Sequence, residues 1–193
     1  MWQLLTMPKK IIILVFIILI LIAGGGFFWW DGNQKDVRGL NKNLPEGVRV
    51  VKSLFGKEYK VVNKIDGYEF KVPKEWKGLN EIEYIPERSE RGYSGDSINI
   101  EGKEGFGRVA GVDRFRVEGN VSLEVWAKKS FEDFGLSGEF SQGRVGQIEI
   151  VKTQEKLHFG GEYVYFFKKS LAIYNITGPS EEFIQEIILN GKW

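Results

Sequence analysis

The chain has 193 residues, of which 42% are hydrophobic and 14% aromatic, so it can bury one domain-sized core and is not disordered as a whole. It contains no cysteine, which excludes disulfides, thiol nucleophiles, iron–sulfur clusters and a lipid-bearing cysteine. Beyond residue 30 the 25 basic and 26 acidic side chains nearly cancel, so we expect no nucleic-acid partner.

An uncharged run, "IIILVFIILILIAGGGFFWW", fills residues 11–30 and comes directly after Lys9 and Lys10. As a helix it would be about 30 Å long, the thickness of the hydrocarbon core of a bilayer. It predicts a single transmembrane signal anchor that contacts the lipid bilayer, with residues 1–10 in the cytoplasm and the rest of the chain outside. The alternative is a cleaved signal peptide and a secreted protein, because residues 23–26 are small.

The next segment, "DGNQKDVRGLNKNL" at residues 31–44, is polar and lacks periodicity, so it predicts a linker. It separates the anchor from an extracytoplasmic domain of residues 45–193. At the start of this domain, apolar residues recur at helical spacing and predict a short amphipathic helix within residues 45–56.

A β-hairpin is predicted next. Apolar residues alternate with charged ones over residues 59–65 and again over residues 68–72, and Asp66-Gly67 between the two runs is a strong hairpin signal. Pro73 ends the second strand because it cannot donate a hydrogen bond to a neighbouring strand. We expect Trp76 to fold back over the sheet edge as an apolar lid.

The same alternation predicts short strands at residues 82–85, 98–101, 115–117 and 147–154. Two longer runs, at residues 162–168 and 171–177, are apolar on both faces and predict a central hairpin that is covered on both sides.

Two amphipathic helices are available as the covering layers. One begins after Ser122 and carries Trp126 in its apolar stripe, and the other begins at Pro179-Ser180. The predicted fold class is therefore α+β, an antiparallel sheet flanked by helices in an α/β/α sandwich, preceded by the transmembrane helix.

This arrangement resembles the PsbP-like fold, named for an extrinsic photosystem II protein and found in membrane-attached bacterial proteins of unknown function. The resemblance covers about residues 59–193 and implies a noncatalytic domain that docks onto, or helps to assemble, a larger membrane complex. A transmembrane anchor departs from the lipid cysteine or thylakoid signal usual in this family. The resemblance rests on the 161–177 hairpin, an isoleucine-rich closing helix and the residues Gly67, Tyr68, Phe70, Pro73, Trp76 and Trp126.

No catalytic or metal-binding pattern is evident, so we expect no enzymatic activity, no cofactor and no metal. The single histidine, His158, could serve as the base of a catalytic triad, but the sequence has no serine in a nucleophile elbow. One histidine without any cysteine also does not make a zinc site. The run "GFGRVA" at residues 105–110 matches a dinucleotide pattern, but the residues after it are typical of a strand, whereas phosphate binding needs a helix N-terminus.

Two loops, residues 86–97 and 135–146, combine charges, glycines and isolated aromatic residues, as binding loops do. They predict a docking surface for a membrane-protein partner. The first alternative is a module that binds a lipid or glycan between sheet and helix, with Trp76 and Trp126 lining the pocket. A hydrolase is the less favoured alternative. The residues proposed for partner binding are Arg88, Arg91, Tyr93 and Phe140.

Overall fold

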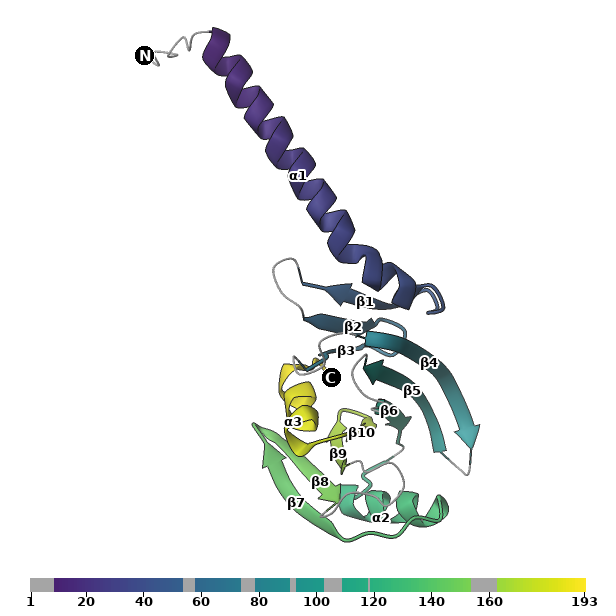
Figure 1. Cartoon of the computed structure of the whole chain (residues 1–193). Coiled ribbons are helices and arrows are strands. Elements are labelled where there is room, and N and C mark those ends of the chain that lie inside the picture. The colour runs from purple at the N-terminus through teal and green to yellow at the C-terminus, as the bar shows by residue number, and fades with distance from the viewer. Residues whose placement is uncertain are drawn as a thin grey trace.

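The computed structural model describes residues 9–53, 58–73, 79–90, 93–102, 109–117, 119–153 and 163–193 (Figure 1). Strands β1 to β3 form a three-stranded antiparallel sheet, the small sheet. The other seven strands form the large sheet, in the order β4-β5-β6-β10-β9-β8-β7. The elements are α1 (Lys9–Asn41), β1 (Val48–Lys52), β2 (Tyr59–Asn63), β3 (Tyr68–Lys71), β4 (Leu79–Glu90), β5 (Tyr93–Gly102), β6 (Val109–Arg116), α2 (Leu123–Asp133), β7 (Phe140–Val145), β8 (Ile148–Thr153), β9 (Tyr163–Lys169), β10 (Ala172–Gly178) and α3 (Glu181–Asn190).

The predicted fold class is wrong. The chain is mostly β, with two antiparallel sheets, and is not an α/β/α sandwich preceded by a transmembrane helix. The physical reason is that the small sheet, and not a helix alone, supplies much of the apolar layer against one face of the large sheet. In the part of the chain that the structure describes, no helix has the length and hydropathy that crossing a membrane requires.

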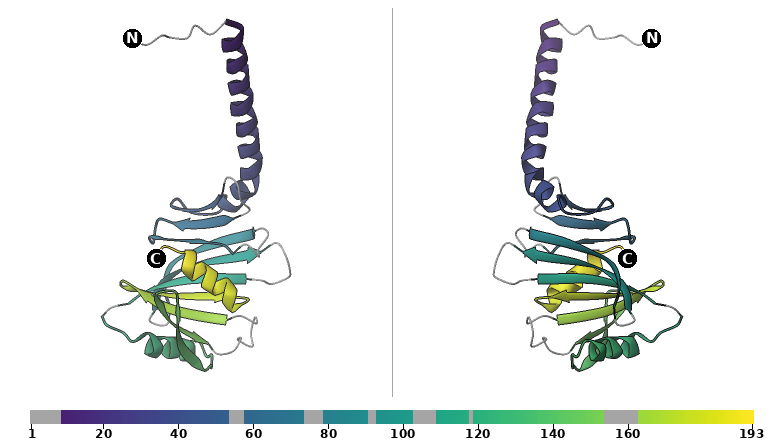
Figure 2. Two further views of the ribbon diagram at one scale, coloured as in Figure 1. Left: turned by 90° about the vertical axis from the view of Figure 1, so that its left-hand side faces the viewer. Right: turned by 90° about the vertical axis from the view of Figure 1, so that its right-hand side faces the viewer.

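Helix α1 is 33 residues long, which corresponds to about 50 Å. Most of it stands clear of the β domain, as we call residues 45–193, and only its C-terminal end packs on the sheets (Figure 2). There Val37 and Leu40 are buried in the core. Residues 31–41 of the predicted linker belong to this helix.

Strand β1 occupies residues for which the sequence predicts a helix, and that prediction is wrong. Val48 and Val50 are buried whereas Arg49 is exposed, which is the two-residue period of a strand. The side chain of Asn41, at the end of α1, holds β1 in place through hydrogen bonds. It donates to the carbonyl of Val50 at 3.0 Å and accepts from the N–H of Val50 at 2.7 Å.

The predicted hairpin at Asp66-Gly67 is confirmed as strands β2 and β3. The first strand ends at Asn63, two residues earlier than predicted, because residues 64–67 form the turn. Gly67 has φ +82°, a conformation that glycine adopts without strain, and its N–H bonds to the carbonyl of Asn63 at 3.0 Å.

The predicted central hairpin is also confirmed, because β10 and β9 lie in the middle of the large sheet. Residues 164–167 of β9 are all buried, so this strand is covered on both faces. Strands β4, β5, β6 and β8 overlap the predicted short strands. The sequence does not predict strand β7, since half of its six residues are exposed and it carries only two large apolar residues.

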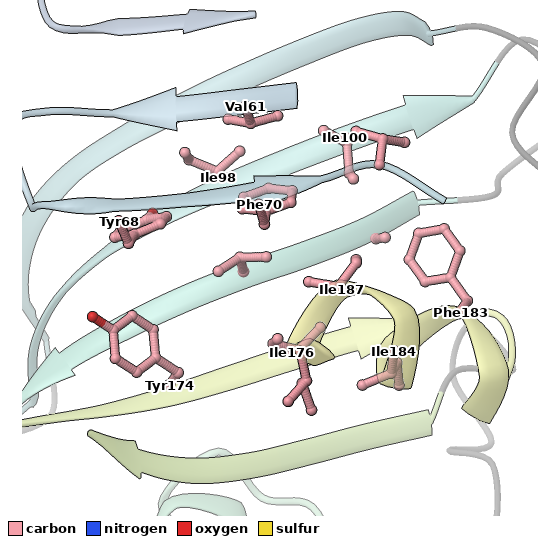
Figure 3. Close-up of a cluster of buried hydrophobic side chains, with 14 of the residues drawn as sticks. Val61, Tyr68, Phe70, Ile98, Ile100, Tyr174, Ile176, Phe183, Ile184 and Ile187 are labelled. Carbon is pink, nitrogen blue, oxygen red and sulfur yellow. The ribbon is translucent and has the colours of Figure 1, made fainter. Parts of the chain in front are cut away.

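Each face of the large sheet has its own hydrophobic core. On one face, the small sheet and α3 pack against it, and Figure 3 shows Val61 and Phe70 beside Ile98 of β5. On the other face, α2 covers β7, β8 and β9. There the Trp126 ring lies 4.9 Å from that of Phe115.

The C-terminus completes the first of these cores. The Trp193 ring stacks on Phe70 at 6.2 Å and meets Phe167 edge-on at 5.1 Å. Lys192 exchanges two backbone hydrogen bonds with Glu69, of 2.9 and 2.7 Å, so the last residues pair with the free side of β3.

Candidate functional site: a carboxylate and arginine network between the sheets

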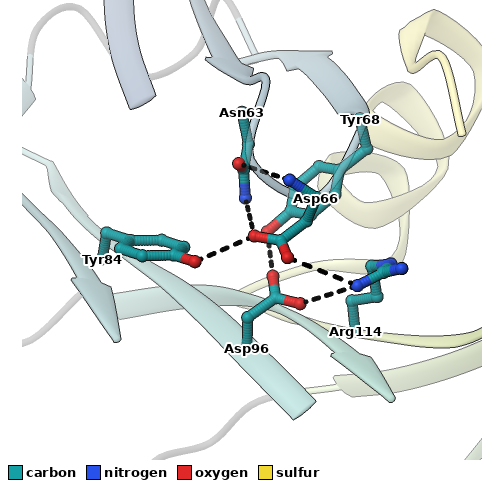
Figure 4. Close-up of polar contacts among 6 residues, drawn as sticks. All are labelled: Asn63, Asp66, Tyr68, Tyr84, Asp96 and Arg114. Carbon is teal, nitrogen blue, oxygen red and sulfur yellow. Dashed lines mark hydrogen bonds and ion pairs between the residues drawn. The ribbon is translucent and has the colours of Figure 1, made fainter. Parts of the chain in front are cut away.

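A cluster of polar side chains lies where the small sheet meets the large sheet (Figure 4). We call it the inter-sheet network. Two of its members come from the β2–β3 hairpin ends, one from the turn between them, and three from the large sheet. They are Asn63 (β2), Asp66 (turn), Tyr68 (β3), Tyr84 (β4), Asp96 (β5) and Arg114 (β6).

Asp66 is the acceptor at the centre of the network. Its Oδ2 accepts from Asn63 Nδ2 at 2.8 Å and from the Tyr84 hydroxyl at 2.9 Å. Its Oδ1 lies 3.4 Å from Nη1 of Arg114. The backbone N–H of Asp66 in turn donates to Asn63 Oδ1 at 3.1 Å, so Asn63 holds the turn residue by both ends of its amide.

Asp96 has fewer donors than Asp66. Its Oδ2 accepts from the Tyr68 hydroxyl at 3.0 Å, and its Oδ1 accepts from Nη1 of Arg114 at 3.2 Å. The Arg114 guanidinium therefore bridges the two carboxylates through one nitrogen. The exposed fractions of the Asp96 and Asp66 side chains are only 1% and 4%.

Burial changes the acidity of this cluster. Burial and, second to it, the nearby negative charge of Asp66 raise the pKa of Asp96 to about 6, while Tyr68 and Arg114 oppose the shift. Burial and the Asp96 charge also raise the pKa of the Tyr68 hydroxyl. Tyr68 is therefore a hydrogen-bond donor at all physiological pH values and not a base.

Chemically, the inter-sheet network can hold a proton and join the two sheets. Its carboxylates face each other and Arg114 in a site from which solvent is nearly excluded. Both carboxylates are therefore nearly out of reach of a substrate in this arrangement.

A second polar cluster lies on the opposite face of the large sheet. Asn175 of β10 donates to Asp113 of β6 at 3.1 Å, and the hydroxyl of Ser97 donates to Asp113 as well. Burial raises the pKa of Asp113 to about 6, with the Ser97 hydrogen bond opposing the shift. The Asn175 Oδ1 atom is buried and has no hydrogen-bond partner among the described residues.

A surface groove of about 500 Å³ lies beside α2 and the β7–β8 hairpin. Its charged residues already pair with one another. Glu124 bonds to Lys128 and Gln142 at 2.7 Å each, and Arg144 bonds to Glu149 at 2.9 Å.

The residues proposed for partner binding fall at two places in the fold. Arg88 and Tyr93 belong to β4 and β5 next to the turn that joins them, but their side chains, and the whole of Arg91, lie outside the described residues. The Phe140 ring packs 4.9 Å from Phe131 and is partly buried against the core.

The residues on which the resemblance to the PsbP-like fold rests are mostly core residues. Tyr68, Phe70 and Pro73 are buried, and Gly67 makes the turn. Trp126 is only 7% exposed and packs on Phe115 and Phe166. Trp76 and His158 lie outside the described residues.

Among the described residues, no group of carboxylate or histidine side chains could hold a metal ion.

The inter-sheet network is absent from the sequence-based predictions, although a signal for it exists. Arg114 shares its strand face with Ala110 and Val112, and Asp96 shares its face with Ile98 and Ile100. A charged residue in step with core residues needs a buried partner of opposite charge, and these two strands pair with each other.

Comparisons with known proteins give no indication of the function, so the function has to be inferred from this geometry. No family model, no curated protein and no solved structure matches the chain. The resemblance to the PsbP-like fold stays a prediction.

Proposed function

We propose that the protein is a noncatalytic accessory domain that α1 holds at a membrane and that docks on a membrane-protein partner. In this proposal the β domain lies on the extracytoplasmic side of that membrane, as expected from the sequence. A single observation carries it, the exposed apolar surface of α1.

Nine consecutive residues of α1, Ile13 to Leu21, are apolar and 45–67% exposed. We call them the apolar segment. They cover the whole circumference of the helix, since nine residues make more than two turns. A helix that is apolar all round is stable only when something apolar surrounds it, and no described part of the β domain does so. A lipid bilayer is the partner that fits this surface.

The connection between the apolar segment and the β domain is continuous and fixed. Helix α1 runs without a break to Asn41, which clamps Val50 of β1 by two hydrogen bonds. Val37 and Leu40 are buried in the core beside it. This arrangement supports a domain held at a set distance from the bilayer, and not one on a flexible tether.

The inter-sheet network supports a noncatalytic role. It is the described cluster with the most strongly perturbed acidity, yet its carboxylates are 1% and 4% exposed and already satisfied by protein donors. Structural networks perturb pKa values as active sites do, and here the protein donors and the burial point to structure.

The turn between β4 and β5 is the docking element in this proposal. Strand β5 pairs with β6 only from Gly95 onward, whereas its pairing with β4 continues to Glu90 and Tyr93. The described ends of the two strands, residues 89–90 and 93–94, therefore extend past the pairing with β6. A hairpin that protrudes from a rigid sheet can present its side chains to a partner. Little conformational entropy is then lost on binding, because the backbone is already ordered.

The membrane part is tested with a single-cysteine variant, which the cysteine-free chain makes unambiguous. Leu171→Cys lies at a position of the β domain that is 73% exposed. We expect the full-length protein to sediment with membranes after alkaline extraction, and an impermeant maleimide to label Leu171→Cys in intact cells. Extraction into the soluble fraction would refute bilayer binding, and labelling only after the cells are lysed would refute the proposed side.

The docking part is tested with a photo-crosslinking amino acid in place of Arg91, in the native membrane. We expect one membrane protein to be crosslinked reproducibly, and Arg88→Ala/Tyr93→Ala to abolish this product. The matched control is Val125→Ala/Lys129→Ala on the exposed face of α2, which should leave the product unchanged. An equal yield from the tip variant would contradict docking through this hairpin.

A further inference from the structure

The inter-sheet network contains more negative than positive charge. Arg114 is the only cation among its members, and its Nη1 serves both Asp66 and Asp96. With both carboxylates ionised, one negative charge would be buried between the sheets without a cation of its own among the described residues. A buried charge of this kind is costly, and a proton is the simplest way to remove it.

We propose that Asp66 and Asp96 hold one proton between them, and that this proton latches the small sheet to the large sheet. The two carboxylates lie on opposite sides of the joint, Asp66 in the β2–β3 turn and Asp96 on β5. With the proton in place, the pair and Arg114 together are neutral. Without it, two like charges face each other across the joint and push the turn away from β5.

The proton resides mainly on Asp96. Asp66 accepts hydrogen bonds from Asn63, Tyr84 and Arg114, whereas Asp96 accepts only from Tyr68 and Arg114. More donors stabilise the ionised form of a carboxylate, so the proton belongs on Asp96, which accepts fewer hydrogen bonds. The raised pKa of Asp96, about 6, agrees with this assignment.

The polar groups around Asp96 come from six described segments of the two sheets. Asp66 is the only other carboxylate in the set and Arg114 the only cation, while the remaining groups are neutral. The residues that contact Asp96 or its neighbours Asp66 and Arg114 are Asn63 from β2, Asp66 from the turn, Tyr68 from β3, Tyr84 from β4, Arg114 from β6 and Tyr174 from β10.

The latch matters because α1 is attached to the small sheet. Asn41 joins α1 to β1, and β1 pairs with β2 over five residues, so the turn that carries Asp66 is connected to α1 through one sheet. Loss of the proton therefore loosens the part of the molecule that holds α1 against the large sheet. This inference does not depend on what surrounds the apolar segment of α1.

The test is amide exchange in the full-length protein in detergent, at about pH 5 and about pH 8, expressed as protection factors. The amides of Asp66 and Gly67 report the turn, because they bond to Asn63. We expect their protection to fall by up to about 100-fold at the higher pH, which corresponds to a shift of about two pKa units. Equal protection at both pH values would overturn the proposal.

Variants separate the latch from general stability. Asp96→Asn mimics the protonated state, so we expect protection of the turn that no longer depends on pH. Asp113→Asn is the matched control, because Asp113 is a partly buried carboxylate whose pKa is also raised but which faces the other side of the sheet, and it should leave the pH dependence of the turn intact. A pH dependence that persists in Asp96→Asn, or disappears in Asp113→Asn, would contradict the latch.

A direct titration keeps the test decisive if Asp96→Asn does not fold. The carboxyl carbon of Asp96 in the wild-type protein, followed by NMR, should titrate about two pH units above an exposed aspartate. A midpoint in the ordinary range for aspartate would refute the proposal.

Discussion

The hydroxyl of Tyr68 donates to Oδ2 of Asp96 at 3.0 Å, and this bond joins the small sheet to the large one. Tyr68 belongs to β3 and Asp96 to β5, which are 28 residues apart in the sequence. The same tyrosine ring stacks against Trp193 at 6.0 Å. One residue therefore ties together the hairpin, the large sheet and the C-terminus.

Tyr68→Phe is expected to destabilise the β domain by about 1–3 kcal/mol, because a buried carboxylate loses one of its two donors. The loss should be larger at about pH 8 than at about pH 5, since the protonated form of Asp96 needs the donor less. Urea unfolding at both pH values measures it. Tyr59→Phe, at the other end of the β2–β3 ladder, is the control and should show no such pH dependence.

The stability of the domain is expected to increase as the pH falls from about 8 to about 5. The pKa values of Asp96 and Asp113 are raised to about 6 in the folded protein, so the native state binds protons more tightly than the unfolded chain does. Their contribution is fully present below the unfolded pKa and is lost as the pH rises through about 6. For Asp96, two pKa units correspond to at most about 3 kcal/mol.

This increase in stability does not continue to strongly acidic pH. Hydrogen bonds from Lys192 and Lys60 lower the pKa of Glu69, and those from Lys152 and Tyr165 lower the pKa of Glu181, so stability falls again when these carboxylates are protonated. Urea unfolding across the pH range tests this profile. Asp96→Asn/Asp113→Asn should flatten it between about pH 5 and 8, and a profile that instead rises towards pH 8 would contradict the assignment.

How far the sequence predicts this structure depends on the signal at each place. The β2–β3 and β9–β10 hairpins are predictable because a turn signal separates clear alternating runs. Strand β1 is predicted as a helix because four apolar residues in a short segment fit both periods, and only its pairing with β2 decides between them. The predicted sandwich is wrong because alternation within strands does not say which strands share a sheet.

The inter-sheet network could be predicted only in part, for a similar reason. The strand period places Arg114 and Asp96 on core faces, so each needs a buried partner. The second carboxylate comes from the β2–β3 turn. Its place in the network depends on how the two sheets pack against each other, which no local sequence pattern predicts. The core role of Trp193 is likewise not predictable, since its neighbours Phe70 and Phe167 are distant in the sequence.

Trp193→Ala is expected to cost about 3 kcal/mol of stability, because the ring contacts Phe70, Phe167 and Tyr174 and its Nε1 donates to the carbonyl of Ile188. Thermal or urea unfolding measures the loss. The control is Leu189→Ala, an apolar residue close by in the sequence that is 59% exposed, and it should change stability little. Equal effects of the two variants would show that Trp193 does not belong to the core.

Asn41→Ala is expected to loosen α1 from the β domain. The change removes both hydrogen bonds to Val50, and the expected cost is about 1–2 kcal/mol, because the freed groups of β1 are only partly buried and water can replace the amide. Amide exchange at Val50 should accelerate while exchange in β9 and β10 stays slow, since those strands lie in the middle of the large sheet. Asn43→Ala, an exposed asparagine in the turn after α1, is the matched control and should leave Val50 protected. If Val50 exchanges at the wild-type rate in Asn41→Ala, the clamp does not hold α1, and the buried side chains of Val37 and Leu40 do so instead.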